Sequence, residues 1–145
     1  VAVLTVRIDG AATAAHDWTM RWRFDPHDWR RAYDVRETLA ETLNAYGTRV
    51  DVPAAELVFG ELVGNAVRHA PGVVEVELTW DDDTTPVLHV IDDGPGYVPC
   101  TDLPDQNAES GRGLYIVAQL TREFTVTQHE PRGAHARAVL LTRDG

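Results

Sequence analysis

Residues 61–69 read Glu-Leu-Val-Gly-Asn-Ala-Val-Arg-His, and this stretch decides how we interpret the rest of the chain. If the segment is helical and Glu61 is set at zero, Asn65 falls at about 40° and Arg68 at about −20°. His69 falls at about 80°. One helix face therefore presents a carboxylate, a carboxamide, a guanidinium and an imidazole. A solvated surface would also explain this face, but asparagine is a poor helix former, which favours a functional site.

Two glycines in the same predicted helix point in the same direction. Gly60 and Gly64 flank the polar face described above. Each glycine lowers helix stability by up to about 1 kcal/mol relative to alanine. We therefore expect another group to pack close to them.

A second segment combines an apolar strand with a carboxylate at its end. Strand parity places Asp92 on the same face as Leu88 and Val90, so that a charged group closes an apolar row. A buried carboxylate needs a hydrogen-bond donor, and the amino group of adenine is a suitable one. The Gly94-Pro95-Gly96 sequence that follows allows close approach of the chain. It is equally the sequence of an ordinary turn, and that alternative stays open.

The third segment, Gly111-Arg112-Gly113-Leu114, opens a predicted helix. A glycine-rich turn that leads directly into a helix directs free backbone N–H groups and the positive end of the helix dipole at an anion. The arginine adds a planar fork of donors. Taken alone, a Gly-x-Gly step is weak evidence for a phosphate site.

The charged residues exclude several classes of protein. All 13 basic residues are arginine, against 23 acidic residues, so a Walker A lysine, a eukaryotic-type kinase lysine and Schiff-base chemistry are excluded. Fifteen of the acidic residues lie within 36–110 with only three arginines, which disfavours a nucleic-acid partner. The single cysteine and the lack of a signal or membrane-spanning pattern predict a cytoplasmic protein with no membrane partner.

Hydrophobic periodicity predicts an α+β fold, a two-layer α/β sandwich with helices on one face of a mixed β-sheet. We expect residues 1–17 to be an N-terminal arm with at most a short strand at 3–8, and residues 18–145 to form the domain. The predicted elements are strand 18–24, helix 28–46, helix 53–69 capped by Asp51, strands 73–80 and 87–92, a polar loop at 97–110, helix 113–121, strand 124–129 and a last strand ending near 141.

The order of the three segments resembles a known ATP-binding fold. Glu61-x-x-x-Asn65 on a helix, Asp92-x-Gly94-x-Gly96 after a strand and Gly111-x-Gly113-Leu114 opening a helix are similar to the N, G1 and G2 boxes of the Bergerat (GHKL) superfamily. This superfamily includes gyrase B, Hsp90, histidine kinases and mismatch-repair ATPases. Residues 61–69 and 92–96, and the small size of the chain, resemble more closely the bacterial anti-sigma-factor serine/threonine kinases of partner-switching systems. The resemblance covers roughly residues 18–142.

The resemblance implies ATP and Mg²⁺ as cofactors and assigns roles by position. Asn65 would coordinate Mg²⁺ through its amide oxygen, and Glu61 would be the catalytic base. Asp92 would accept a hydrogen bond from the adenine amino group, and residues 97–110 would form a lid. The other ATP-binding residues would be Arg68, His69, Gly94, Gly96, Gly111, Arg112, Gly113 and Leu114. For His69, a packing role is an open alternative.

The implied function is an ATP-dependent protein serine/threonine kinase that phosphorylates an anti-anti-sigma (STAS-type) partner and, in an alternative complex, sequesters a sigma factor. The alternatives are a non-catalytic ATP-dependent protein-binding module and an ATPase domain excised from a larger regulator. The catalytic domain of a histidine kinase is disfavoured, because no phospho-accepting helix pair precedes the domain in these residues and because a glutamate before the asparagine is typical of hydroxyl- or water-activating members.

One departure from the family pattern predicts slow or lost turnover. The final hairpin of such kinases carries a Gly-Thr or Gly-Lys step, whereas this chain has Gly133-Ala134-His135-Ala136. A homodimer is a further expectation, with either the strand containing Trp18 and Trp22 or the first helix as its face, although core packing explains these aromatic residues equally well.

Overall fold

The computed structural model describes residues 3–8, 18–46, 49–69, 72–81, 85–94, 112–128 and 133–142, with only the backbone of 3–8. The loop predicted at 97–110 lies outside these ranges. The elements are β1 (Val3–Ile8), β2 (Trp18–Phe24), α1 (Trp29–Tyr46), α2 (Val52–His69), β3 (Val74–Asp81), β4 (Thr85–Asp92), α3 (Arg112–Gln119), β5 (Thr121–Gln128) and β6 (Ala134–Leu140).

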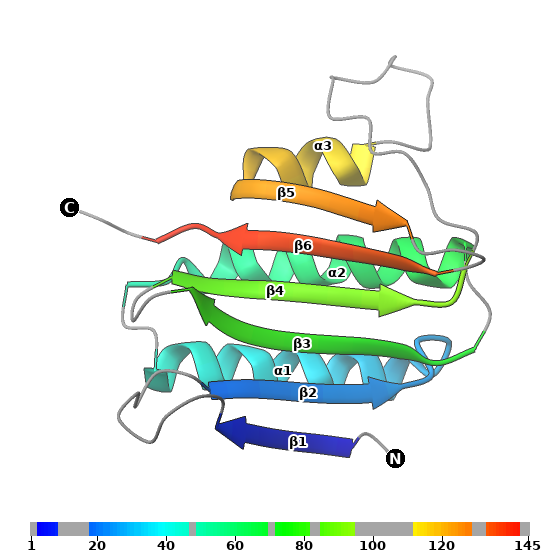
Figure 1. The fold of residues 1–145 in the computed structure, drawn as a ribbon, viewed down its shortest axis with the longest axis horizontal. Helices are drawn as coiled ribbons and strands as arrows, with labels where there is room; N and C mark the ends of the chain where they lie inside the picture. Colours follow the sequence, from blue (N-terminus) through cyan, green and yellow to red (C-terminus); the bar gives the residue numbers. More distant parts are fainter. Residues whose placement is uncertain are drawn as a thin grey trace.

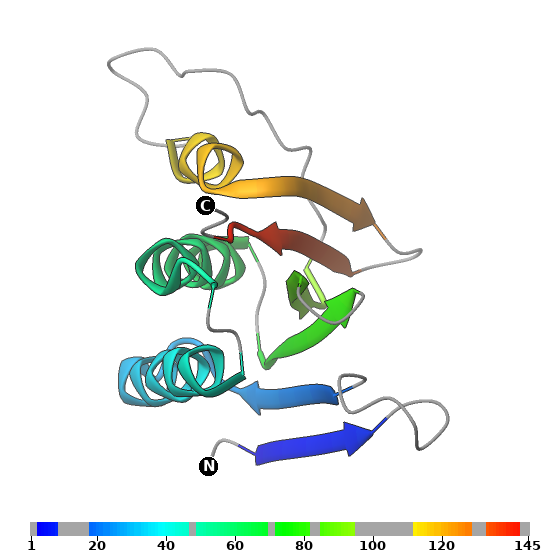
Figure 2. The same cartoon turned by 90° about the vertical axis from the view of Figure 1, so that its left-hand side faces the viewer.

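The described elements form two layers, as predicted. The six strands make one sheet in the order β1-β2-β3-β4-β6-β5 (Figure 1). Figure 2 shows the three helices together on one face of this sheet. The short strand allowed for residues 3–8 is confirmed and pairs with β2 at the sheet edge. The domain boundary expected at residue 18 stays a prediction.

The sheet is antiparallel at every described pairing, and the expectation of a mixed sheet is wrong in this respect. Helices α1 and α2 both lie between β2 and β3 in the chain. The chain therefore passes along the helix layer twice before β3 pairs antiparallel with β2. Strands β4 and β5 run in the same direction, but β6 lies between them. No parallel neighbours therefore arise among the described strands.

Aspartates begin both long helices. The Oδ1 atom of Asp28 accepts the backbone N–H groups of Arg30 and Arg31 at 3.1 and 3.4 Å. Asp51 caps α2 as predicted, because its Oδ1 accepts the N–H of Ala54 at 3.1 Å. These bonds satisfy donors that lack partners within the first helical turn. They fix where α2, which carries the candidate site, begins.

The short helix and the strand that follows it differ from the prediction by a few residues. Helix α3 ends at Gln119, and β5 begins at Thr121 and not at Phe124. The N–H of Leu120 still donates to the carbonyl groups of Ile116 and Val117, which closes the helix. Thr121 then pairs with Leu140 of β6. Pairing with a neighbouring strand therefore sets this boundary, and periodicity within the segment does not reveal it.

The core lies between the helix layer and one face of the sheet. Trp22, Val76, Val90 and Ala136 are buried and lie opposite one another in successive strand pairs. The alternation predicted for residues 18–24 is confirmed at Trp22, which is only 2% exposed. Its side chain fills the core and is not available as a dimer face.

The other face of the sheet carries polar and charged side chains. Arg21 on β2 lies 2.6 Å from Glu75 and 3.2 Å from Glu77, both on β3. Arg137 on β6 lies 2.8 Å from Asp81. These cross-strand pairs are partly exposed, so each adds little stability in isolation.

Candidate functional site

The predicted polar face of α2 is present in the structure. Asn65 is buried, at 6% exposure, while Glu61 is half-buried one turn earlier and Arg68 is exposed one turn later. Nη2 of Arg68 donates a hydrogen bond to Oδ1 of Asn65. Three of the four predicted residues thus share one face, and the side chain of His69 lies outside the described atoms.

The bond from Arg68 fixes the orientation of the Asn65 amide. A guanidinium can only donate hydrogen bonds, so the amide oxygen must face it. The Nδ2 atom of Asn65 consequently points elsewhere, is buried and has no hydrogen-bond partner among the described residues. A buried donor without an acceptor destabilises a protein by about 1–3 kcal/mol. Such a donor fits a site whose ligand supplies an acceptor oxygen.

Glu61 differs from Asn65 in its surroundings. Its carboxylate is half-buried, and no ion pair joins it to an arginine or histidine in the part of the chain that the structure describes. Arg68 donates to Asn65. A carboxylate that is not neutralised by a fixed cation remains available to accept a proton.

Asp92 ends β4 on the face that strand parity predicts. Leu88 and Val90 are buried on the helix-facing side of the sheet, and Asp92 follows them there at 9% exposure. Its Oδ1 accepts the backbone N–H of Gly94 at 2.7 Å. This bond makes the turn after β4 part of the site and holds the carboxylate in place.

A second contact ties this turn to the final hairpin. The carbonyl oxygen of Gly94 accepts the N–H of Gly133 at 2.8 Å. Gly133 has φ of 117°, a conformation that favours glycine. The next residue, Ala134, is buried directly opposite Asp92. Ala134 therefore places a methyl group beside the Asp92 carboxylate, where the threonine of a Gly-Thr step would offer a hydroxyl.

The elements that carry the site converge at one end of the molecule. Helix α2 packs against β4 and α3. The carboxyl end of β4, the end of α2 and the start of α3 lie on the right-hand side of Figure 1. Leu114 is buried in α3 and belongs to the core. The structure does not describe the predicted residues Gly96 and Gly111. Of Arg112 and Gly113 it describes only the backbone.

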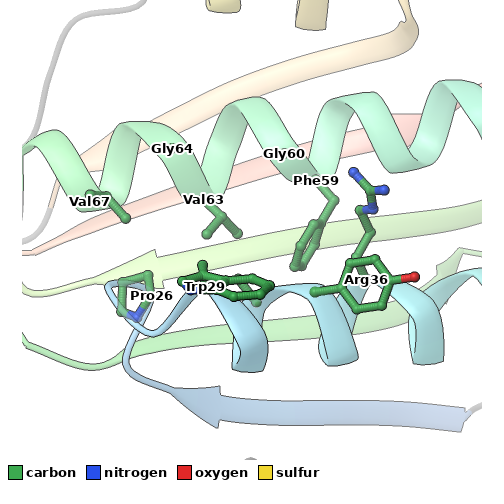
Figure 3. A pocket seen from close by; sticks show the side chains of 10 residues that line it. Pro26, Trp29, Arg36, Phe59, Gly60, Val63, Gly64 and Val67 are labelled. Carbon is green, nitrogen blue, oxygen red and sulfur yellow. The ribbon is translucent and has the colours of Figure 1, made fainter.

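The glycines of α2 do not behave as expected. No described atom lies within 4 Å of the position that a Cβ would take at Gly60 or Gly64, so the expectation of close packing is wrong. Both glycines instead line a cavity between α1 and α2 (Figure 3). By helix geometry Gly64 lies about 100° from Asn65 and about 40° from Arg68 around α2, so the cavity adjoins the polar face.

A histidine pair that the sequence does not predict lies on the far side of the sheet. Nδ1 of His89 lies 2.8 Å from Nε2 of His135, and Nε2 of His89 lies 2.8 Å from Oγ1 of Thr79. Burial, reinforced by the charge of His135, lowers the pKa of His89 from 6.5 to about 4. The alternation in β4 would have placed His89 on this face, but the pairing with β6 is not encoded locally.

Two further observations concern metals and membranes. Among the described residues, no group of three or more histidine, cysteine or acidic side chains is arranged to hold a metal ion. Within the same residues, no helix has the length and hydropathy of a membrane-spanning segment.

Comparison with known proteins agrees with this geometry. The sequence model of the histidine kinase-like ATPase domain family matches residues 5–140. The chain belongs to this family. Membership places the ATPase domain in the GHKL (Bergerat) superfamily and implies ATP binding and ATP-dependent kinase chemistry.

A solved structure supports the fold. Histidine kinase AdeS of Acinetobacter baumannii is similar to the ATPase domain over 86% of this chain and 68% of its own chain, with a TM-score of 0.50 and 17% identity. At this identity the similarity concerns the fold alone. No sequence among the curated proteins matches the ATPase domain.

Proposed function

We propose that the ATPase domain is an anti-sigma-type protein serine/threonine kinase that phosphorylates a hydroxyl of an anti-anti-sigma (STAS-type) partner and, in an alternative complex, sequesters a sigma factor. One observation carries the proposal. Half-buried Glu61, which no described cation neutralises, lies one helical turn before buried Asn65. In this position Glu61 accepts the proton of the attacking hydroxyl.

The side chains around Glu61 fit ATP and Mg²⁺. When bound, ATP would supply the phosphoryl group, and Mg²⁺ would supply the positive charge that balances the phosphates during transfer. Asp92 accepts a hydrogen bond from the adenine amino group, and the unpaired Nδ2 of Asn65 donates to an acceptor oxygen of the ligand. Oδ1 of Asn65, which accepts a hydrogen bond from Arg68 in the structure, would be the atom that holds the metal. The start of α3, with Arg112, holds the phosphates through backbone N–H groups.

The substitution Glu61→Gln tests the base. It keeps the size of the side chain and removes its ability to take a proton, so phosphoryl transfer from γ-labelled ATP to a recombinant STAS-type domain should fall about 10²- to 10⁴-fold. ATP affinity, measured by calorimetric titration, should be unchanged.

Asp92→Asn is the matched control, because it should weaken ATP binding itself by about ten- to a hundredfold through loss of a charged acceptor. Undiminished transfer by Glu61→Gln would rule out Glu61 as the base, whatever Asp92→Asn does.

Two observations favour a second function, a non-catalytic module in which ATP controls partner choice. Oδ1 of Asn65, the proposed metal-binding atom, already accepts a hydrogen bond from Arg68, and Ala134 offers no hydroxyl beside Asp92. Binding of one ATP per chain by the unaltered protein, without transfer of label to any STAS-type domain tested, would support the module and contradict the kinase.

A further inference from the structure

A groove separates α1 from α2 on the surface of the helix layer. It has a volume of about 350 Å³, and Figure 3 shows Trp29, Phe59 and Val63 around it. Phe59 and Val63 are buried at its base, whereas Gly60 is exposed. A Cβ at Gly60 or Gly64 would meet no atom within 4 Å. The two glycines therefore keep the groove open on the α2 side.

The α1 side of the groove carries three residues of the kinds that dominate binding energy at protein interfaces. Trp29, Tyr33 and Arg36 follow one another at i, i+4 and i+7, so they form one stripe on the helix. Trp29 is 70% exposed and Tyr33 is 53% exposed. A different face of α1, with Val35 and Leu39, already fills the core. Folding thus leaves this aromatic stripe uncovered.

Arg36 gives the groove a specific charge preference. Within the described part of the chain, its Nε atom is buried without a hydrogen-bond partner, and no carboxylate forms an ion pair with its guanidinium. Its guanidinium carbon lies 5.9 Å from the centre of the Tyr33 ring. Because Nε itself is closed to solvent, a carboxylate arriving from outside would pair with the Nη groups of this half-buried guanidinium through a charge-assisted hydrogen bond.

The length of the groove matches two turns of helix. Phe59 and Val67 both line it and are eight residues apart, which is about 12 Å along the helix axis. Side chains at i, i+4 and i+7 of a docked helix span about 10.5 Å. We propose that this groove docks an amphipathic α-helix of a partner protein, whose apolar residues lie over Gly60 and Gly64 and whose carboxylate pairs with Arg36. The proposal does not depend on phosphoryl transfer.

Two synthetic helical peptides of about four turns test the proposal. Both carry leucine at i, i+4 and i+7; one has glutamate and the other lysine at the flanking positions. The whole chain has a formal net charge of −10, so non-specific attraction favours the lysine peptide. Fluorescence anisotropy should instead show that the glutamate peptide binds at least about tenfold more tightly. Equal binding, preference for the lysine peptide or no binding of either would overturn the proposal.

Two variants locate the binding. Gly60→Leu places a side chain in the groove, and its Cβ meets no described atom within 4 Å, so it should weaken binding of the glutamate peptide at least about tenfold. Arg36→Gln should abolish the preference for glutamate over lysine. Ala45→Leu, which introduces the same side chain at an exposed position of α1 outside the groove, should leave binding unchanged.

The groove must also be free of a second copy of the chain. Sedimentation velocity should show the same oligomeric state for the unaltered protein and for Gly60→Leu. A dimer that Gly60→Leu converts to a monomer would assign the groove to self-association and overturn the proposal. Unchanged peptide binding by Gly60→Leu would equally place the peptide elsewhere.

Discussion

The two faces of β4 place single polar residues in different environments. Asp92 faces the helices and ends the core, whereas His89 faces away from them and meets His135 and Thr79. Glu77 lies opposite His89 on β3, and its charge favours protonation of the imidazole. Burial and the charges of His135 and Arg137 oppose protonation and prevail, so His89 is neutral in the folded protein at neutral pH.

The lowered pKa of His89 predicts a loss of stability in mild acid. The pKa of His89 in the folded protein, about 4, lies below the unfolded value of 6.5. The stability that the protein gains from neutral His89 is therefore fully present above pH 6.5 and is lost as the pH falls towards 4. Allowing for solvent screening, the free energy of unfolding should fall by about 2 kcal/mol from this group. His89→Gln removes the titration and leaves the carboxylates in place. Urea unfolding at several pH values should therefore show the unaltered protein losing about 2 kcal/mol more than the variant; parallel curves would refute this.

At the scale of elements, we expect glycine to affect stability in opposite ways within α2 and in the turn residue just before β6. Gly60→Ala adds a methyl group to a helix where nothing obstructs it, so it should raise the free energy of unfolding by about 0.5–1 kcal/mol. Gly133→Ala imposes a side chain on a residue with φ of 117° and should lower it by about 1 kcal/mol or more. Urea denaturation measures both changes, and stabilisation by Gly133→Ala would contradict the backbone argument.

The sequence predicts elements whose cause is local. Alternation around Trp22 predicts β2, Asp51 predicts the start of α2, and parity places Asp92 on the core face. Features that depend on partners far along the chain are not predictable in this way. The start of β5 follows from pairing of Thr121 with Leu140, and the contact of His89 with His135 follows from strand register.

The glycines of α2 and the arginine beside Asn65 show a second limit. A glycine in a helix indicates that the absence of a side chain has a purpose. The sequence does not distinguish close packing of a neighbour from a groove that a side chain would fill. At Gly60 and Gly64 the structure gives a groove. Periodicity places Arg68 near Asn65, yet only the side-chain conformations show that its Nη2 donates to the proposed metal ligand. Which partner a polar group chooses depends on the whole environment.

In the whole molecule, α2 separates two surfaces of different chemistry. Its Glu61 and Asn65 side belongs to the candidate nucleotide site, and its Gly60 and Gly64 side belongs to the groove with α1. Both surfaces extend towards the end of α2, where Val67 of the groove adjoins Arg68. A partner bound in the groove would therefore lie next to the residues proposed for phosphoryl transfer. The fold brings docking and chemistry together through one helix.

The overall charge predicts how nucleotide binding responds to metal. A chain of formal net charge −10, with fifteen acidic residues between 36 and 110, repels the phosphates of ATP unless a cation offsets them. Without metal, Oδ1 of Asn65 also stays with Arg68. ATP with excess Mg²⁺ should raise the midpoint of thermal unfolding, and EDTA should remove most of that increase and weaken ATP binding at least about tenfold. Sodium chloride at matched ionic strength controls for screening. Tight ATP binding in excess EDTA would show that arginines and backbone dipoles alone hold the phosphates.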